Sequence, residues 1–336
     1  MFKQNLDAEN QRITKVFDNV LWEDVKNTKT YLHSLPLLAH YTSIEALEKI
    51  MKGDELWFSN PFYMNDKEEW EFGVRESAAL FREHVGVRMA CPEETYKHLR
   101  VNFEFLLDEF NKKDAFDTYV FCMTQHDGTP DDGMLSMWRG YGSNGNGVAI
   151  IFDTSKISYD QNVGFLLLSS VQYYSPAARR AWVNAKLSEF SEVLRKENLP
   201  TDKLYLALHS LFERLKMFAL FAKHDGFGEE REWRAVYLTD YDGDNKLQKM
   251  LGYAMGPHGI EPKFKLKVGP IDGITDQNFL LEKMVSKIIL GPSVSSPIAK
   301  MCVERMLKTC NKQELVNKVT NSTIPFRALS NRWQSD

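Results

Sequence analysis

The stretch Leu38-Ala39-His40-Tyr41-Thr42-Ser43-Ile44-Glu45-Ala46-Leu47 joins a short apolar run to the start of a helix. The apolar run is typical of a buried strand. Thr42 and Glu45 form a Thr-x-x-Glu capping box, which predicts that a helix begins immediately afterwards. In proteins of mixed architecture, strand ends that lead into helices commonly expose reactive side chains. We therefore expect His40 and Tyr41 to lie at the mouth of a site.

Composition indicates a globular protein that buries a substantial core. The chain has 336 residues, of which 43% are hydrophobic and 26% are charged. The net charge is −4 and no dense basic block is present, so unspecific electrostatic binding of nucleic acid is not favoured, although a local basic groove is compatible with this balance. The four cysteines show no C-x-x-C pair and no metal-type spacing, which indicates a reducing compartment.

The sequence favours a soluble, cytoplasmic protein with no membrane partner. Residues 1–10 are polar and lack the cationic-then-apolar order of a signal peptide. The most apolar long stretch, Leu204 to Phe221, is interrupted by His209, Glu213 and Lys216. That pattern predicts a buried amphipathic helix and not a membrane span.

Hydrophobic periodicity predicts an α+β fold, because strands and helices intermingle without a regular βαβ rhythm. Residues 1–35 are expected to form an N-terminal helical arm, and residues 36–330 a single α+β domain with a helical insertion at about 176–223. Strands are expected at 36–41, 55–59, 117–124, 147–152, 164–173, 231–239, 264–268, 287–290 and 323–329, and helices at 8–33, 43–52, 67–84, 92–113, 134–141, 176–197, 203–223 and 296–309.

The letters Gly140-Tyr141-Gly142-Ser143-Asn144-Gly145 match the dinucleotide fingerprint G-x-G-x-x-G. That fingerprint works only when a strand precedes the glycines and a helix follows, so that amides at the helix start meet the pyrophosphate. Here the expected helix precedes the glycines and the expected strand follows them. We therefore interpret this segment as a tight loop between a helix and a strand.

The charged residues Glu230, Glu232 and Arg234 stand at every second position of an expected strand. Alternate residues of a strand share one face, so the two carboxylates and the guanidinium are expected on the same side. An exposed ion-pair ladder of this kind contributes about 0–1 kcal/mol and has no function. If the pair is buried instead, loss of one partner costs about 3–5 kcal/mol, which would indicate a role in stability.

Ordinary structural roles explain the other candidate residues as well. A single histidine such as His40 is more often a hydrogen-bonded, partly buried residue than a catalyst. Trp138 and Tyr141 are three residues apart on an expected helix, a spacing typical of packing. Asn65 can cap the helix that begins near Asp66.

Taken together and in this order, several short motifs resemble those of a widespread uncharacterised bacterial family. The family pattern is H-Y-T-S, F-S-x-P-x-x-x-N-D, F-C-x-[ST], M-W-x-x-Y, G-[VI]-x-[IL]-x-F, E-x-E-W-R and I-I-L-G-P. In this chain the matching segments are His40 to Ser43, Phe58 to Asp66, Phe121 to Thr124, Met137 to Tyr141, Gly147 to Phe152, Glu230 to Arg234 and Ile288 to Pro292. The resemblance spans roughly residues 36–292.

The front of this pattern is similar to the first motif of ADP-ribosyltransferases, in which a strand bearing His or Arg is followed by a helix and a second strand. Those enzymes also carry a late acidic residue, often in an E-x-E arrangement. The similarity implies a mixed, mostly antiparallel central sheet of that type. It also implies NAD as the substrate and transfer of ADP-ribose to water or to a macromolecule, protein or nucleic acid, in the setting of bacterial toxins and phage defence.

The resemblance further implies roles for individual residues. Glu232 would stabilise the positive charge that develops on the ribose as the nicotinamide–ribose bond breaks, and Glu230 would orient or activate the acceptor. His40 would hydrogen-bond the adenosine-side ribose. The remaining candidates for binding the dinucleotide are Tyr41, Thr42, Ser59, Trp138, Tyr141 and Arg234.

Two other functions are compatible with the sequence. The protein can be a non-catalytic recognition or sensor module of a bacterial defence system, in which the aromatic and ionic clusters are structural or bind a trigger. Alternatively, Asp66, Glu68, Glu230 and Glu232 can form a Mg²⁺ site for phosphodiester cleavage, since carboxylate oxygens suit that ion. The second alternative is disfavoured because no lysine sits beside the glutamates in the manner usual for nucleases.

Overall fold

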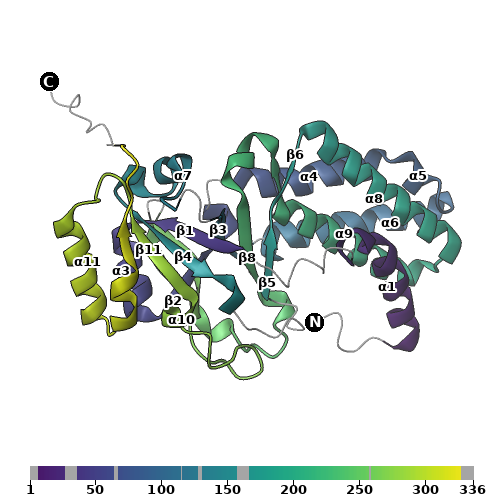
Figure 1. The fold of residues 1–336 in the computed structure, drawn as a ribbon. Coiled ribbons are helices and arrows are strands. Elements are labelled where there is room, and N and C mark those ends of the chain that lie inside the picture. The colour runs from purple at the N-terminus through teal and green to yellow at the C-terminus, as the bar shows by residue number, and fades with distance from the viewer. Residues whose placement is uncertain are drawn as a thin grey trace.

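The computed structural model describes residues 7–26, 36–63, 67–114, 116–127, 131–156, 166–256 and 259–326. As expected, the fold is α+β, with a mostly antiparallel sheet between a large helical body on one side and shorter helices on the other (Figure 1). The strands of the main sheet are β1 Leu37–Thr42, β2 Glu55–Ser59, β3 Thr118–His126, β4 Val148–Asp153, β5 Leu166–Ser170, β8 Glu232–Leu238, β9 Leu251–Gly256, β10 Gly259–Lys267, β11 Val285–Leu290 and β12 Val319–Asn321.

β3 is the central strand of this sheet. One edge of β3 pairs along Thr118–Thr124 with β8, and β5 lies beyond β8. The other edge belongs to the path β12-β11-β4-β1-β3-β2-β10-β9. Among the described residues, β11 and β12 are the only neighbouring strands of the main sheet that run parallel. Two further strands, β6 Gln172–Tyr174 and β7 Ala222–His224, pair in parallel as a separate small sheet.

β1 and β2 both pair with the same edge of β3, but at different positions along that edge. β1 pairs with β3 at residues 124–126, whereas β2 pairs with β3 through Ser59 and Val120. In this register the intervening residues, Phe121 to Met123, have no strand partner on that edge among the described residues. We call this opening between β1 and β2 the fork. A forked sheet leaves backbone groups of β3 to be satisfied by side chains.

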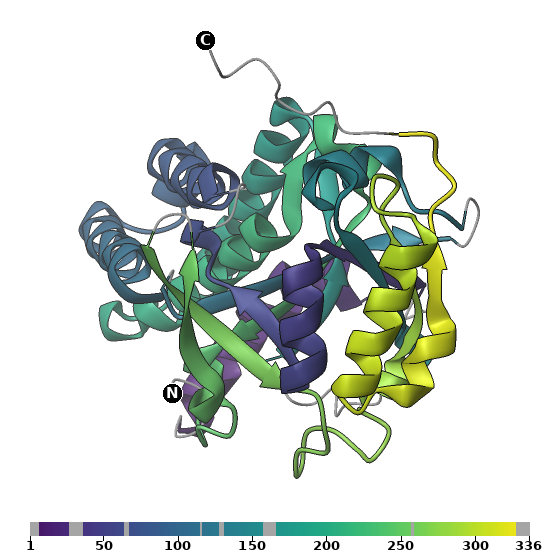
Figure 2. The ribbon, with the colours of Figure 1, turned by 90° about the vertical axis from the view of Figure 1, so that its left-hand side faces the viewer.

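Helices cover both faces of the sheet. They are α1 Ala8–Leu21, α2 Glu23–Lys26, α3 Ile44–Gly53, α4 Lys67–Glu83, α5 Val85–Arg88, α6 Glu93–Glu109, α7 Leu135–Gly140, α8 Pro176–Glu197, α9 Leu204–Phe221, α10 Leu281–Met284 and α11 Pro297–Thr309. The helical body packs around α9, which is buried along most of its length, and shares a core with Val120 and Val236 of the sheet. α3 and α11 lie on the opposite face of the sheet (Figure 2). Their buried side chains share a core with Phe121 and Tyr237.

The N-terminal helix packs against the helical body. Ile13, Phe17 and Leu21 of α1 are buried in the same core as α8 and α9. Arg214 of α9 donates to the carbonyl of Leu21 at 3.1 Å, which satisfies an acceptor at the end of α1. The rest of the predicted arm, 1–6 and 27–35, lies outside the described residues, and the division into an arm and one domain stays a prediction.

The first helix after β1 begins as expected, but with a different cap. Ser43, and not Thr42, is the N-cap residue, and its hydroxyl accepts from the backbone N–H of Ala46 at 3.0 Å. Thr42 is still paired with Val148 as the last residue of β1. The strand therefore extends one residue further than the capping-box pattern predicted.

At the C-terminal end the predicted strand 323–329 does not form over 323–326, and 327–329 lie outside the described residues. The last strand of the described residues is Val319–Asn321, and 322–326 form no strand. Pro325 lacks the N–H that a paired strand needs, which explains why the apolar alternation there does not form a strand. β9 was not predicted either, because its Gly252 and Gly256 have low strand propensity.

The helix-to-strand interpretation of the glycine-rich segment is confirmed, since α7 precedes it and β4 follows. Across the ranges that the structure describes, no helix has both the length and the apolar character that crossing a bilayer requires.

Gly147 allows the closest backbone approach in this loop. A Cβ at this position would lie 2.2 Å from the carbonyl oxygen of Thr42 and 2.9 Å from the backbone of Gly142, neither of which can rotate away. We expect Gly147→Ala to lower the free energy of unfolding by about 1–3 kcal/mol, as overpacking does. Gly140→Ala is the control, because its Cβ would meet no atom within 4 Å. Equal denaturant midpoints for the two variants would contradict this packing.

Candidate functional site

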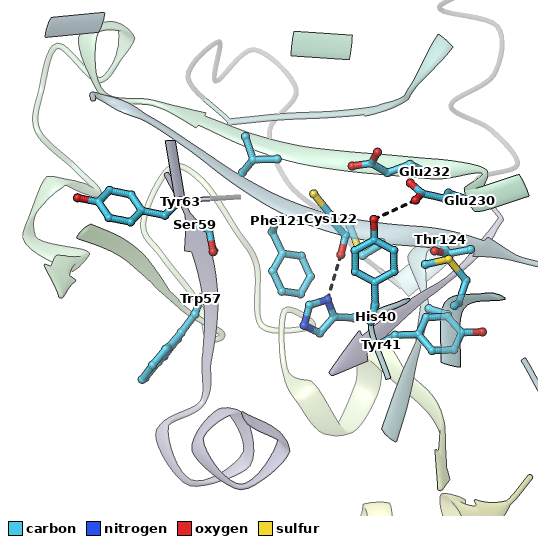
Figure 3. A pocket seen from close by; sticks show the side chains of 15 residues that line it. His40, Tyr41, Trp57, Ser59, Tyr63, Phe121, Cys122, Thr124, Glu230 and Glu232 are labelled. Carbon is cyan, nitrogen blue, oxygen red and sulfur yellow. Dashed lines mark hydrogen bonds between the residues drawn. The ribbon is translucent and has the colours of Figure 1, made fainter. Parts of the chain in front are cut away.

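A pocket of about 260 Å³ lies at the fork. Residues 120–124 of β3 form its floor, β1 contributes His40 and Tyr41, and β2 contributes Trp57 and Ser59. Glu230 and Glu232 lie at the end opposite β2 (Figure 3), and Tyr141 also lines the pocket. Segments that are far apart in the sequence therefore meet at one cavity.

Most of the residues that the sequence singled out line this pocket. They are His40, Tyr41, Ser59, Tyr141, Glu230 and Glu232. Thr42, Trp138 and Arg234 are not part of its lining. An imidazole, an aromatic ring and a carboxylate from distant segments thus line one cavity.

Trp138 supports the pocket wall without lining it, in contrast to the expectation that it contacts a cofactor. Its side chain is fully buried, and its indole N–H donates to the carbonyl of Asp132 at 3.0 Å. The ring of Tyr41 meets it edge to face, with centroids 4.9 Å apart. Tyr41 is held further by its hydroxyl oxygen, which accepts from the N–H of Met134 at 2.9 Å. Trp138 therefore fixes the position of Tyr41.

His40 lies in the fork and hydrogen-bonds to a backbone carbonyl of β3 there. Nδ1 of His40 lies 3.0 Å from the carbonyl oxygen of Cys122, and the imidazole stacks on Phe121 with centroids 4.3 Å apart. Because a carbonyl only accepts, Nδ1 carries the proton and Nε2 keeps its lone pair. Burial lowers the pKa of His40 below its usual 6.5, although the hydrogen bond to Cys122 opposes this shift. The ring is therefore a neutral acceptor at pH 7.

The Glu232–Arg234 pair is buried, which excludes a solvated surface ladder. Both side chains are about 6% exposed. Nε of Arg234 donates to one carboxylate oxygen of Glu232 at 2.7 Å, and a second guanidinium nitrogen donates to the other at 3.0 Å. Arg234 also donates to the carbonyl of Leu220 at 2.7 Å. The bidentate geometry holds the carboxylate in one orientation.

Lys223 joins the two glutamates, a role that the sequence did not predict. Its side chain is 0% exposed, and its Nζ lies 2.7 Å from Glu230 Oε2 and 3.4 Å from Glu232 Oε2. A lysine therefore accompanies the glutamates in space, although none sits beside them in the sequence in the manner usual for nucleases. The available signal was that Lys223 lies only two residues after the apolar stretch that ends at Phe221.

Glu230 lies outside the strand, contrary to the expected alternation. It ends a short 3₁₀ segment, and Arg231 then adopts a left-handed φ of 42° before β8 begins at Glu232. The other oxygen of Glu230 accepts from the hydroxyl of Tyr141 at 2.9 Å. The two carboxylates are therefore brought together by Lys223 and not by strand geometry. We call Lys223, Glu230, Glu232 and Arg234 the charge cluster.

The charge cluster keeps Glu232 ionised. Burial raises the pKa of Glu232, but the charge and hydrogen bonds of Arg234, with Lys223 and the thiol of Cys122, outweigh burial and bring the pKa below its usual 4.5. The backbone N–H of Glu232 also donates to the hydroxyl of Tyr173 at 2.8 Å. The pocket thus has a fixed, negatively charged carboxylate beside a neutral imidazole.

A metal site receives no support from the described residues. They contain no group of three or more His, Cys, Asp or Glu side chains placed to hold a metal ion. Asp66 lies outside the described residues, and nothing is described of the side chain of Glu68. Lys223 also places its ammonium between Glu230 and Glu232, where a divalent ion shared by the two would have to bind.

Comparison with known proteins identifies one related family. Residues 137–235 match the family model described as a protein of unknown function, DUF2971. The matched segment includes Tyr141, Lys223 and both glutamates of the pocket, whereas His40 lies outside it. The expected resemblance to an uncharacterised family is confirmed at this level. Searches of curated proteins and of solved structures gave no match.

Replacing the buried carboxylate should destabilise the protein in a pH-dependent manner. Glu232→Gln leaves Arg234 and Lys223 without their shared partner, so we expect a loss of about 3 kcal/mol in the free energy of unfolding. Because the folded pKa of Glu232 lies below 4.5, the stabilisation is fully present above that value and is lost as the pH falls through the folded pKa. Denaturant unfolding at several pH values measures the difference.

The control for this prediction is an exposed pair. Arg82 and Glu104 form a two-pronged contact on the surface, at 2.7 and 2.8 Å. Glu104→Gln should cost less than about 1 kcal/mol. A Glu232→Gln variant no less stable than Glu104→Gln would refute the buried, ionised state of Glu232.

Proposed function

We propose that the protein cleaves the nicotinamide–ribose bond of NAD and passes ADP-ribose to water or to a macromolecular acceptor. The observation that carries the proposal is the placement of the fixed, ionised carboxylate of Glu232, a second carboxylate from Glu230 and the neutral imidazole of His40 around one pocket. This arrangement supports bond cleavage that develops positive charge on a sugar.

The charge cluster would stabilise the oxocarbenium-like ribose. Bond cleavage separates neutral nicotinamide from a ribose that becomes cationic, so a negative group fixed beside the ribose lowers the barrier. Glu232 is held by Arg234 and Lys223 before any substrate binds, which avoids reorganisation during the reaction. Glu230 is more exposed than Glu232, at 15% against 6%, and would orient the incoming acceptor.

Aromatic and polar groups would hold the rest of the nucleoside. Tyr141 is 37% exposed and is tied to Glu230, which positions it to stack on nicotinamide. Nε2 of His40 is an acceptor and would take a ribose hydroxyl proton in a hydrogen bond. Ser59, which accepts from Lys263 at 2.9 Å, lies across the fork.

The main alternative is a recognition module in which the charge cluster has only a structural role. The buried ion pairs are compatible with that role, since loss of one partner of a buried pair destabilises a fold whether or not it is catalytic. The two functions differ in what a carboxylate variant changes. A structural cluster alters stability alone, whereas a catalytic one alters turnover in protein that remains folded.

Release of nicotinamide from labelled NAD tests the proposal. We expect Glu232→Gln to reduce release by about 10²–10³-fold in protein shown to be folded. Tyr141→Phe should reduce nicotinamide release by roughly tenfold, because it removes the hydrogen bond from the Tyr141 hydroxyl to Glu230. Tyr141 is partly exposed, so this substitution tests the hydrogen bond with little effect on the core. Glu230→Gln should reduce label transfer to an acceptor more than nicotinamide release.

Glu229→Gln is the matched control, because this neighbouring glutamate is exposed and does not line the pocket. It should leave release unchanged. If the native protein releases no nicotinamide and transfers no label to protein, DNA or RNA, the proposal fails and the recognition module is favoured.

A further inference from the structure

The pocket is smaller than a dinucleotide requires. Sites that enclose drug-sized ligands occupy roughly 300–1,000 Å³, and this pocket has about 260 Å³. A nucleotide that places its ribose beside Glu232 would therefore extend beyond the cavity. Figure 3 shows the pocket residues in two groups, with Glu230 and Glu232 at one end, Trp57, Ser59 and Tyr63 at the other, and His40 between them. The end formed by β2 is where the remainder of a ligand would lie.

Trp57 is fixed at that end by contacts on its edge and its face. Its indole N–H donates to Glu55 at 3.0 Å, which sets the ring orientation. Nζ of Lys265 lies 4.4 Å from the ring centroid, within cation–π distance. Lys265 is the direct cross-strand neighbour of Trp57 in the β2–β10 ladder. An aromatic surface and a cation are therefore presented together at the pocket end.

Lys265 differs from the other lysines of β10 in its charge balance. Lys263 pairs with Glu261 at 3.0 Å, and Lys267 pairs with Glu55 at 2.9 Å. None of the ion pairs between described residues includes Lys265. Its positive charge is thus balanced by no described carboxylate, and it stands beside a pocket-lining indole. That combination suits a nucleotide, in which a sugar joins a phosphate group to a planar base.

We infer that Trp57 and Lys265 form a subsite for the phosphate-bearing half of the nucleotide, with Lys265 contacting the diphosphate and Trp57 packing against the adenosine. The inference deepens the proposed function and rests on it for the identity of the ligand as NAD. The binding itself does not depend on whether a bond is cleaved. It requires only that a lysine contacts the phosphates of a nucleotide and that an aromatic ring packs against its base. His40, between the two ends, would then contact the sugar that links them.

Calorimetric titration of the full chain with ADP-ribose and with adenosine tests the subsite. Lys265→Ala should raise the Kd for ADP-ribose by about tenfold or more, the scale of a lost hydrogen bond to a charged group. It should leave adenosine binding unchanged, because adenosine carries no phosphate. Added salt should weaken ADP-ribose binding to the native protein more than to this variant.

Lys267→Ala is the matched control, since it removes the same charge from the same strand face. It should change the Kd for ADP-ribose by less than about twofold, as expected for an exposed ion pair. Trp57→Ala should weaken both probes, and Trp57→Phe should restore most of the affinity. Equal effects of Lys265→Ala and Lys267→Ala, or no binding of ADP-ribose by the native protein, would overturn the subsite.

The nicotinamide assay on the same variants separates the two proposals. ADP-ribose binding that depends on Lys265 in a protein that releases no nicotinamide supports the subsite and refutes bond cleavage. Nicotinamide release with an unchanged KM in Lys265→Ala supports bond cleavage and refutes the subsite.

Discussion

The fork in the central sheet is the constraint on which the rest of the site depends. A strand edge left without a partner has to satisfy its polar backbone groups in another way. At the fork, the carbonyl of Cys122 receives a hydrogen bond from the imidazole of His40. This contact fixes the tautomer of His40 and directs its other nitrogen toward the opening. The same gap in strand pairing that creates the pocket therefore places a defined acceptor inside it.

The charge cluster closes the other end of the pocket and links the sheet to the helical body. Lys223 follows α9 closely, and Arg234 of β8 donates to the carbonyl of Leu220 in α9. The glutamates are thereby held between a helix and a strand that belong to the same hydrophobic core. Such pairs are costly to desolvate, and their fixed geometry is more informative about function than about net stability. Packing of α9 against β8 is thus coupled to the position of both carboxylates.

Much of the fold, and part of the site, could be predicted from the sequence. The apolar run before His40 and the strand around Phe121 carry strong periodicity, and both formed as expected. The order of residues along the chain did not reveal which side chains would contact each other. The pairing of Lys223 with Glu230 was not predicted, because it depends on the left-handed turn at Arg231, which sequence pattern alone does not indicate. The contact of Trp57 with Lys265 was not predicted either, because it depends on the register of β2 with β10.

A structure of the protein with ADP-ribose and nicotinamide bound tests the central claim most directly. The account predicts nicotinamide beside Tyr141, a ribose between His40 and the charge cluster, and the phosphates toward Lys265. Binding of these ligands away from the fork, or an empty fork at saturating ligand, would contradict it.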